Sequence, residues 1–155
     1  MPSATIDTPT GPLTITEEDG AIVGIEWGRG HGCDNTPLLA RAQDQIDEYF
    51  AGNRTEFDLP LKVRGSDFQR AVCDVMSAIP FGETVTYGDI AKQLNIPAQA
   101  IGQACGGNPI PLIIPCHRVL GASGLGGFSG DGGGLAGIEL KVQLLRHEGA
   151  AGLLI

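Results

Sequence analysis

Two residues that could act as a nucleophile and a base stand side by side at Cys116 and His117, with Pro115 before them and Arg118 after them. The thiolate is the reactive form of cysteine, and a neighbouring imidazole or cation lowers the pKa of a thiol from about 8.5. The apolar run at residues 110–114 is short and interrupted by proline, so we expect Cys116 to lie where a rigid buried segment meets a loop. A small buried cysteine beside a chance histidine is the competing interpretation.

The carboxylate of Glu148 is at an unusual position, the C-terminal end of the last expected helix, residues 135–148. Glu148 lies there at the unfavourable end of the helix dipole, directly before Gly149, which ends the helix. This acid is either solvated or balanced by a cationic or imidazole partner. The apolar face of the same helix consists of Leu135, Ile138, Val142 and Leu145.

The composition is that of a small globular protein. A chain of 155 residues with 42% hydrophobic and 18% charged residues can bury a core in one domain or two small ones. No apolar run approaches the roughly 20 residues that span a bilayer, and the first residues lack the features of a signal peptide. The cysteines form no CxxC pair or zinc-type spacing, so we expect reduced thiols, no metal and a cytoplasmic location; they are Cys33, Cys73, Cys105 and Cys116.

The net charge of −8 is concentrated in one part of the chain. Residues 1–60 hold 3 Lys and Arg against 11 Asp and Glu, a balance of −8, whereas residues 61–155 hold 7 of each, a balance of 0. Binding of nucleic acid requires positive charge at the phosphates. The second part could therefore meet DNA, although it has no basic patch to raise the affinity.

The first part of the chain is predicted to be a small α+β unit. An antiparallel meander is indicated by alternating or β-branched residues at residues 4–8, 11–16 and 22–27. A helix is expected to begin after Thr36 as N-cap, with Pro37 in its first turn, and to stop at Gly52. Residues 57–61 are expected to add an edge strand, and His31 to be an exposed loop residue. Nothing in this part indicates chemistry, so we assign it a supporting role.

The second part is predicted to be mainly helical. Ser66 is expected to cap a helix, with Gln69 three residues later completing a capping box. A helix at residues 84–94, a tight turn at residues 95–97 and a helix of small residues at residues 97–105 match a helix-turn-helix unit. Many helical hairpins bind nothing, but small side chains on the second helix favour close approach in the narrow minor groove of DNA.

These motifs together resemble one protein family. The sequences GNP at residues 107–109, PCHRV at residues 115–119 and LLRHEG at residues 144–149 are similar to the O6-alkylguanine-DNA alkyltransferases, also known as methylated-DNA–protein-cysteine methyltransferases. The strong motifs cover about residues 66–149, and the N-terminal unit fits the family more loosely.

The resemblance implies an α+β fold: an RNase H-like domain with a small antiparallel sheet and a helix at residues 1–62, then a helical domain with a helix-turn-helix at residues 63–155. It implies a monomer that binds double-stranded DNA in the minor groove and flips out the damaged nucleotide. An alkyl group would move irreversibly from O6 of guanine, with O4 of thymine as a further candidate, to Cys116. The product is a thioether without a usable leaving group, so the protein would react once and no cofactor is implied.

The resemblance also implies a role for individual residues. Cys116 would be the nucleophile, His117 would take its proton through a water, and Glu148 would orient and balance the imidazole. Asn108 would brace the active-site turn, and Tyr87 would donate to a ring nitrogen of the flipped guanine. The substrate pocket would be lined by Val119, Ser129, Gly130, Lys141 and Cys105. The DNA contacts would be made by Thr86, Ala98, Gln99, Ala100, Gly102, Gln103 and Arg118.

The chain departs from the family in two places. Gln99 stands where the family commonly has an arginine that fills the space left by the flipped base, so DNA affinity or its salt dependence is expected to be weaker. The glycine-rich segment at residues 121–134 permits close backbone approach to a ligand, but it is a few residues longer than in the shorter family forms. Its context also excludes a phosphate-binding loop.

Three other functions compete with alkyl transfer. An alkyltransferase-like protein binds damaged DNA without transfer, but such proteins usually have tryptophan in place of Cys116. A Cys-His-Glu hydrolase would need an oxyanion hole and would leave no lasting mass increase on the cysteine. A transcription factor that uses the helix pair alone would need a dimerisation segment or a basic recognition helix, and the sequence shows no clear example of either.

The charge distribution generates a first prediction. If DNA meets only the C-terminal part, reversing a charge in the N-terminal part by Asp47→Lys should change affinity for duplex DNA only weakly. Fluorescence-anisotropy titration of the wild type and the variant with a labelled duplex measures this. A loss of base flipping in the variant would contradict the assignment of the DNA contacts to the C-terminal part.

Overall fold

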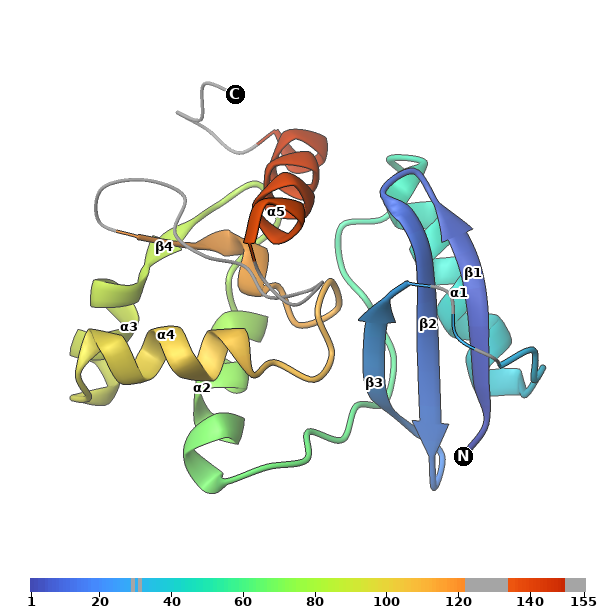
Figure 1. Cartoon of the computed structure of the whole chain (residues 1–155), viewed down its shortest axis with the longest axis horizontal. Coiled ribbons are helices and arrows are strands. Elements are labelled where there is room, and N and C mark those ends of the chain that lie inside the picture. Colours follow the sequence, from blue (N-terminus) through green and yellow to red (C-terminus); the bar gives the residue numbers. More distant parts are fainter. Residues whose placement is uncertain (29, 31, 122–133, 150–155) are drawn as a thin grey trace.

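A computed structural model describes the chain except for residues 29, 31, 122–133 and 150–155, and describes residues 134–138 by their backbone alone. The chain forms two units that lie side by side, an N-terminal sheet with one helix and a C-terminal group of helices (Figure 1). This confirms the α+β class. None of the helices among the described residues has the length and apolar character needed to cross a membrane. His31 lies outside the described residues.

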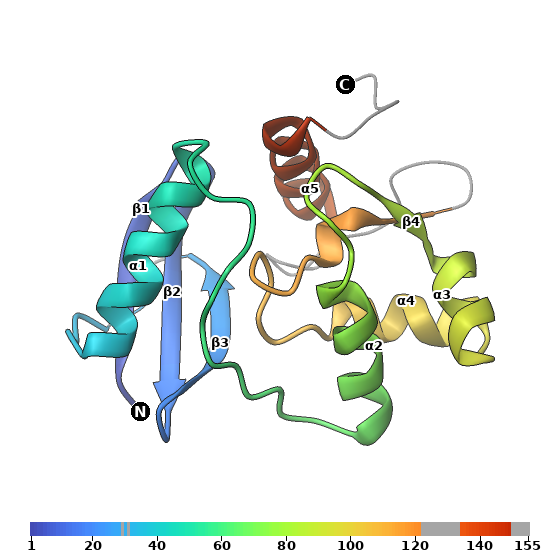
Figure 2. The ribbon, with the colours of Figure 1, turned by 180° about the vertical axis from the view of Figure 1, so that it is seen from behind.

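The N-terminal unit is the predicted antiparallel meander. Its strands follow in the order β1 (Ser3–Thr8), β2 (Gly11–Glu18) and β3 (Ala21–Trp27). Alternation along the strands buries one set of side chains, and Ile15, for example, pairs with Ile25 in the register of β2 and β3. Figure 2 shows α1 (Pro37–Phe50) lying across one face of this sheet.

The helix α1 has the predicted ends. The side chain of Thr36 accepts a hydrogen bond from the backbone N–H of Leu39 at 3.1 Å, which satisfies one of the free amides of the first turn. Gly52, with a φ of +82°, follows the helix. The buried face of α1 consists of Leu39, Ala42, Gln45, Ile46 and Tyr49.

The prediction of an edge strand at residues 57–61 is wrong. Only Leu61 pairs with the sheet, through an isolated parallel bridge to Ile22. Pro60 has no amide hydrogen, and the backbone N–H and C=O of Asp58 are taken by the side chain of Gln45 at 2.8 and 3.0 Å. This segment therefore hydrogen-bonds to α1 rather than to a strand.

The C-terminal unit contains α2 (Asp67–Ser77), α3 (Tyr87–Leu94), α4 (Ala98–Gly106) and α5 (Gly134–Glu148). Ser66 caps α2 as predicted, by accepting from the backbone N–H of Gln69 at 3.1 Å. The predicted capping box is wrong, because the side chain of Gln69 donates instead to the carbonyl of Ala104 at 2.7 Å and ties α2 to α4.

The helix-turn-helix is formed by α3 and α4. Asn95 ends α3 in the left-handed conformation, and Pro97 leads directly into α4. The first helix begins at Tyr87 rather than at residue 84, because β4 (Val85–Thr86) pairs in parallel with β5 (Val119–Leu120). Thr86 and Asp89 then form a reciprocal capping box. The pairing of β4 with β5 attaches the helix pair to the segment that carries Cys116.

The apolar segment before Cys116 is buried, but it is not a strand. Its prolines lack amide donors, and the chain turns back on itself, with the N–H of Ile114 donating to the carbonyl of Ile110 at 2.9 Å. Leu112 has a φ of +75°, and the segment leads into the 3-10 turn η1 (Cys116–Arg118). Pro109 links it to the sheet, since its carbonyl accepts from the N–H of Ile25 at 3.0 Å.

Candidate active site

The carboxylate of Glu148 is the centre of a buried hydrogen-bond network. Its Oε2 lies 2.7 Å from Nε2 of His117, and its two oxygens accept from Nε and Nη2 of Arg118 at 2.8 and 3.0 Å. Burial alone would raise the pKa of Glu148, but the hydrogen bonds from His117 and Arg118 outweigh it and hold this pKa well below its usual range. The acid at the end of α5 therefore has both an imidazole and a cationic partner.

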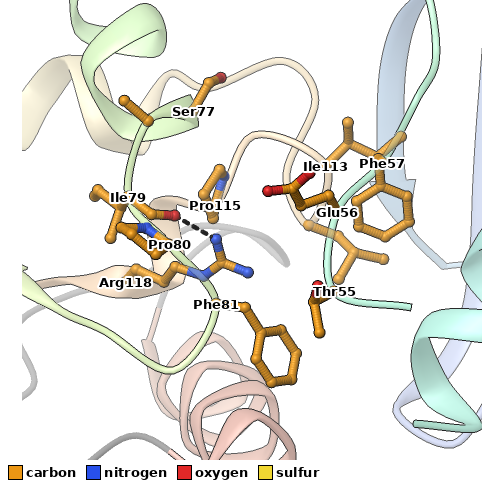
Figure 3. A pocket seen from close by; sticks show the side chains of 12 residues that line it. Thr55, Glu56, Phe57, Ser77, Ile79, Pro80, Phe81, Ile113, Pro115 and Arg118 are labelled. Carbon is orange, nitrogen blue, oxygen red and sulfur yellow. Dashed lines mark hydrogen bonds between the residues drawn. The ribbon is translucent and has the colours of Figure 1, made fainter. Parts of the chain in front are cut away.

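Arg118 does not lie at the DNA-binding surface where the sequence placed it. Its side chain is 8% exposed, and its third hydrogen bond goes from Nη1 to the carbonyl of Ile79 at 2.6 Å. The guanidinium also lies 5.8 Å from the ring centroid of Phe81. Figure 3 shows it between Ile79, Pro80 and Phe81, at the wall of a cavity between the two units. Its charge compensates Glu148 instead of a phosphate.

The thiol of Cys116 is buried and needs help to ionise. Burial raises its pKa to about 11, although a hydrogen bond from Asn108 and the charge of Lys141 act in the opposite direction. Asn108 also braces the turn, by donating to the carbonyl of Ile114 at 2.8 Å and accepting from the N–H of Ile110 at 3.0 Å. Such a thiol requires a neighbouring base before it can act as a nucleophile.

His117 has the properties of that base. Burial lowers the pKa of its imidazole, so the ring is held towards its neutral form. Because the carboxylate of Glu148 only accepts, the hydrogen of the neutral ring is on Nε2, and Nδ1 is left as the acceptor. Nδ1 is buried and has no hydrogen-bond partner among the groups that the structure describes. The ring can therefore receive a proton on the side away from Glu148.

Lys141 is a buried cation whose charge acts on the thiol of Cys116. Its Nζ donates to the carbonyl of Val119 at 2.6 Å and lies 5.8 Å from the ring centroid of Tyr87. Burial lowers the pKa of Lys141 to about 8, opposed by the charges that Cys116 and Cys105 would carry as thiolates. Burial raises the pKa of Tyr87 to about 12, so its hydroxyl remains a donor. These contacts bring together five of the predicted catalytic and pocket residues, namely Tyr87, Cys105, Cys116, Val119 and Lys141.

The predicted DNA contacts on α4 form an exposed and uncharged surface. Ala98, Gln99 and Gln103 are exposed, whereas Ala100 and Gly102 are half-buried. A Cβ added to Gly102 would meet no atom within 4 Å, so this side of the helix is open. Thr86 lies at the start of α3, where its side chain serves as the N-cap. The predicted pocket residues Ser129 and Gly130 lie outside the described residues.

The sequence analysis missed one residue that touches this network. The hydroxyl of Tyr49, from α1 of the N-terminal unit, donates to Oε2 of Glu148 at 2.6 Å. The helical pattern places Tyr49 on the buried face of its helix, but no local signal connects it with a residue far along the chain.

The site combines a thiol with a neighbouring imidazole and a carboxylate, and β4 and β5 attach it to a helix-turn-helix. This combination defines the class of DNA-binding proteins that carry a nucleophile. The family model of the 6-O-methylguanine DNA methyltransferase ribonuclease-like domain matches residues 1–63, and that of the DNA binding domain matches residues 67–150. The chain belongs to the 6-O-methylguanine DNA methyltransferase family.

Individual relatives agree with the family models. The chain is 41% identical to a methylated-DNA–protein-cysteine methyltransferase of Mycobacterium tuberculosis, over 96% of this chain and 94% of the relative. It is 38% identical to the constitutive enzyme of that name in Bacillus subtilis, over 93% of each chain. Among solved structures, the crystal structure of M. tuberculosis OGT in complex with DNA is 42% identical, with a TM-score of 0.84 over 96% of this chain and 93% of that chain.

The buried ion pair generates a prediction on stability. The variant Arg118→Leu leaves Glu148 without its cation and should lower the free energy of unfolding by about 3–5 kcal/mol at neutral pH. The lowered pKa of Glu148 contributes stability above its unfolded value near 4.3, and this contribution is lost as the pH falls through the folded value. Arg118→Leu raises the pKa of Glu148 in the folded state, so the difference in free energy of unfolding between variant and wild type should shrink at acidic pH. Urea unfolding at several pH values measures this difference.

A surface ion pair provides the control. Arg54 lies 3.2 Å from Glu48, and both side chains are partly exposed. Arg54→Leu should cost less than about 1 kcal/mol at every pH. Equal losses for the two variants would refute the assignment of Arg118 to a buried network.

Proposed function

We propose that this protein repairs DNA by moving an alkyl group from O6 of guanine to Sγ of Cys116, once per protein molecule. The observation that carries this function is the buried hydrogen bond between Glu148 and His117, the residue next to Cys116, in a member of this family. A thiol whose pKa is raised to about 11 would be inert without such a base. The reaction is a methylated-DNA–[protein]-cysteine S-methyltransferase reaction.

The proton of the thiol is the first group to move. Nδ1 of His117 receives it through a water, and Glu148 balances the imidazolium from the Nε2 side. The charge of Lys141 stabilises the thiolate, and Asn108 holds the turn on which the thiol stands.

The thiolate then attacks the alkyl carbon. An S–C bond forms while the O6–C bond breaks, and the electron pair of the broken bond stays on the guanine. The hydroxyl of Tyr87, whose pKa is raised to about 12, donates to a ring nitrogen of the flipped base and stabilises that charge. The S-alkylcysteine is a thioether that water does not cleave, so no group of the site can regenerate the thiol.

The helix pair α3–α4 presents the protein to duplex DNA. Its open surface of small and amide side chains favours the minor groove, with Gln99 at the place of the flipped base. The protein acts as a monomer in the cytoplasm, and the free state of the cysteines Cys33, Cys73, Cys105 and Cys116 supports a reducing compartment. Residues 1–62 and 63–155 are its two domains.

Intact-protein mass spectrometry tests the reaction directly. After incubation with a duplex that contains O6-methylguanine, the wild type should gain one methyl group per molecule, and Cys116→Ser should gain none. Cys33→Ser, which removes an exposed thiol remote from the site, should react like the wild type. Binding without any gain would instead favour a damage-binding protein of the alkyltransferase-like kind. Turnover without a lasting gain would favour a hydrolase.

The neutral residue at the flipped base generates a second test. Gln99→Arg should raise DNA affinity and steepen the dependence of log K on log salt by about one phosphate contact. Gln103→Arg, one turn further along the exposed face of α4, should also raise DNA affinity. Only Gln99→Arg should also accelerate transfer, because only this side chain enters the vacated space. Equal transfer rates in the two variants, measured by rapid quench, would refute that position for Gln99.

A further inference from the structure

We propose that Tyr49 of the N-terminal unit is a positioning residue for alkyl transfer, which holds Glu148 in the orientation that makes His117 a base. The inference rests on the proposed function. It assigns to the N-terminal unit a part in the chemistry, whereas only a supporting role was predicted for that unit from the sequence. The hydroxyl of Tyr49 donates a hydrogen bond to Oε2 of Glu148 at 2.6 Å, across the boundary between the two units.

Tyr49 binds the same oxygen atom as the catalytic imidazole. Oε1 of Glu148 accepts only from Arg118 among the described groups, whereas Oε2 accepts from the hydroxyl of Tyr49, from Nε2 of His117 and from Nη2 of Arg118. The negative charge on Oε2 is therefore shared among the phenol, the imidazole and the guanidinium. The strength of the phenol's hydrogen bond sets how strongly Glu148 stabilises the imidazolium of His117.

The hydroxyl of Tyr49 keeps its proton well above neutral pH. Burial and the adjacent charge of Glu148 raise the pKa of its hydroxyl far above the ordinary value. The hydrogen bond is therefore not lost through ionisation of the phenol. Since a carboxylate has no hydrogen of its own, the direction of this bond is also determined.

The ring of Tyr49 is fixed by neighbours from both units. It contacts the rings of Phe50, Phe57 and Phe81, with centroid distances of 5.0, 5.5 and 6.1 Å, and that of His147 at 4.7 Å. Nε2 of His147 also lies 2.7 Å from the backbone carbonyl of Tyr49. The residue directly before Glu148 thus anchors to the same tyrosine, which fixes the end of α5 against α1. A hydroxyl held in this way can orient a carboxylate.

The variant Tyr49→Phe removes the hydroxyl and keeps the ring in its packing. Two changes are expected in the single-turnover rate of transfer measured against pH. The rate at high pH should fall about tenfold, because a Glu148 carboxylate that can rotate no longer holds the imidazole of His117 in one position. Because Oε2 loses a donor, it stabilises the imidazolium of His117 more strongly. A higher pH is then needed to keep the ring neutral, so the rise of the rate on the acidic side of the profile should move to higher pH. DNA affinity should stay within about twofold of the wild type.

A purely structural role for Tyr49 predicts a different result. Gln45→Leu is the matched control, because Gln45 is buried one turn earlier on α1 and its hydrogen bonds go to the backbone of Asp58 rather than to Glu148. It should lower the free energy of unfolding without moving the pH profile. An unchanged pH profile in Tyr49→Phe, or an equal shift in Gln45→Leu, would overturn the inference.

A second variant reverses the sign and covers the case in which Tyr49→Phe does not fold. Site-specific 3-fluorotyrosine at position 49 keeps the hydroxyl but makes it a stronger donor to Oε2. The imidazolium of His117 should then be less stabilised, and the acidic side of the profile should move to lower pH; no movement would overturn the inference. A wild type that transfers no methyl group would refute the proposed function instead, and the two failures are therefore distinguishable.

Discussion

The carboxylate of Glu148 joins four separate parts of the chain in one buried network. It receives hydrogen bonds from α1 through Tyr49 and from the turn η1 through His117 and Arg118, and Arg118 in turn binds the segment after α2 at Ile79. Removal of a carboxylate from water costs several kcal/mol unless donors replace its hydration. Because those donors come from different elements, the elements must meet in one arrangement before the charge can be buried. The end of α5, the reactive turn and the N-terminal helix are thus fixed together.

This network also determines how the thiol can react. Exposure or a flanking cation would activate a cysteine permanently, as in many enzymes with low-pKa thiols. Here burial raises the pKa of Cys116 to about 11. Burial also holds the neighbouring imidazole of His117 towards its neutral form. In the proposed mechanism, the thiolate forms only when His117 takes the proton. If the proposed reaction consumes the protein once, a thiol that stays protonated is less open to adventitious oxidants and alkylating agents and so retains its capacity for repair.

Two cations of the C-terminal unit are directed inward, and neither is available to DNA at the surface. Arg118 and Lys141 are both buried, and their hydrogen bonds go to Glu148, Ile79 and Val119 rather than to the surface. The predicted contact surface of α4 is left with alanine, glycine and glutamine. A surface of this kind offers no cation to a phosphate, so the binding proposed for α4 would release few counterions. The acidic N-terminal unit, which holds all of the excess charge of −8, adds repulsion at long range.

The limits of sequence analysis follow from the range of the interactions involved. The caps Thr36 and Ser66 and the turn at Asn95 act on residues three or four positions away, so their patterns predicted α1, α2 and the helix pair. Gln69 and residues 57–61 were assigned wrongly because a distant backbone competed for the same hydrogen bonds, at Ala104 in one case and from Gln45 in the other. Glu148 could be singled out because a charge at the wrong end of a helix is a local anomaly. The donor Tyr49 could not, since 99 residues separate it from Glu148 and a tyrosine on a buried helical face is an ordinary core residue. A buried charge thus indicates from sequence alone that partners exist, whereas only the fold identifies the element that supplies them.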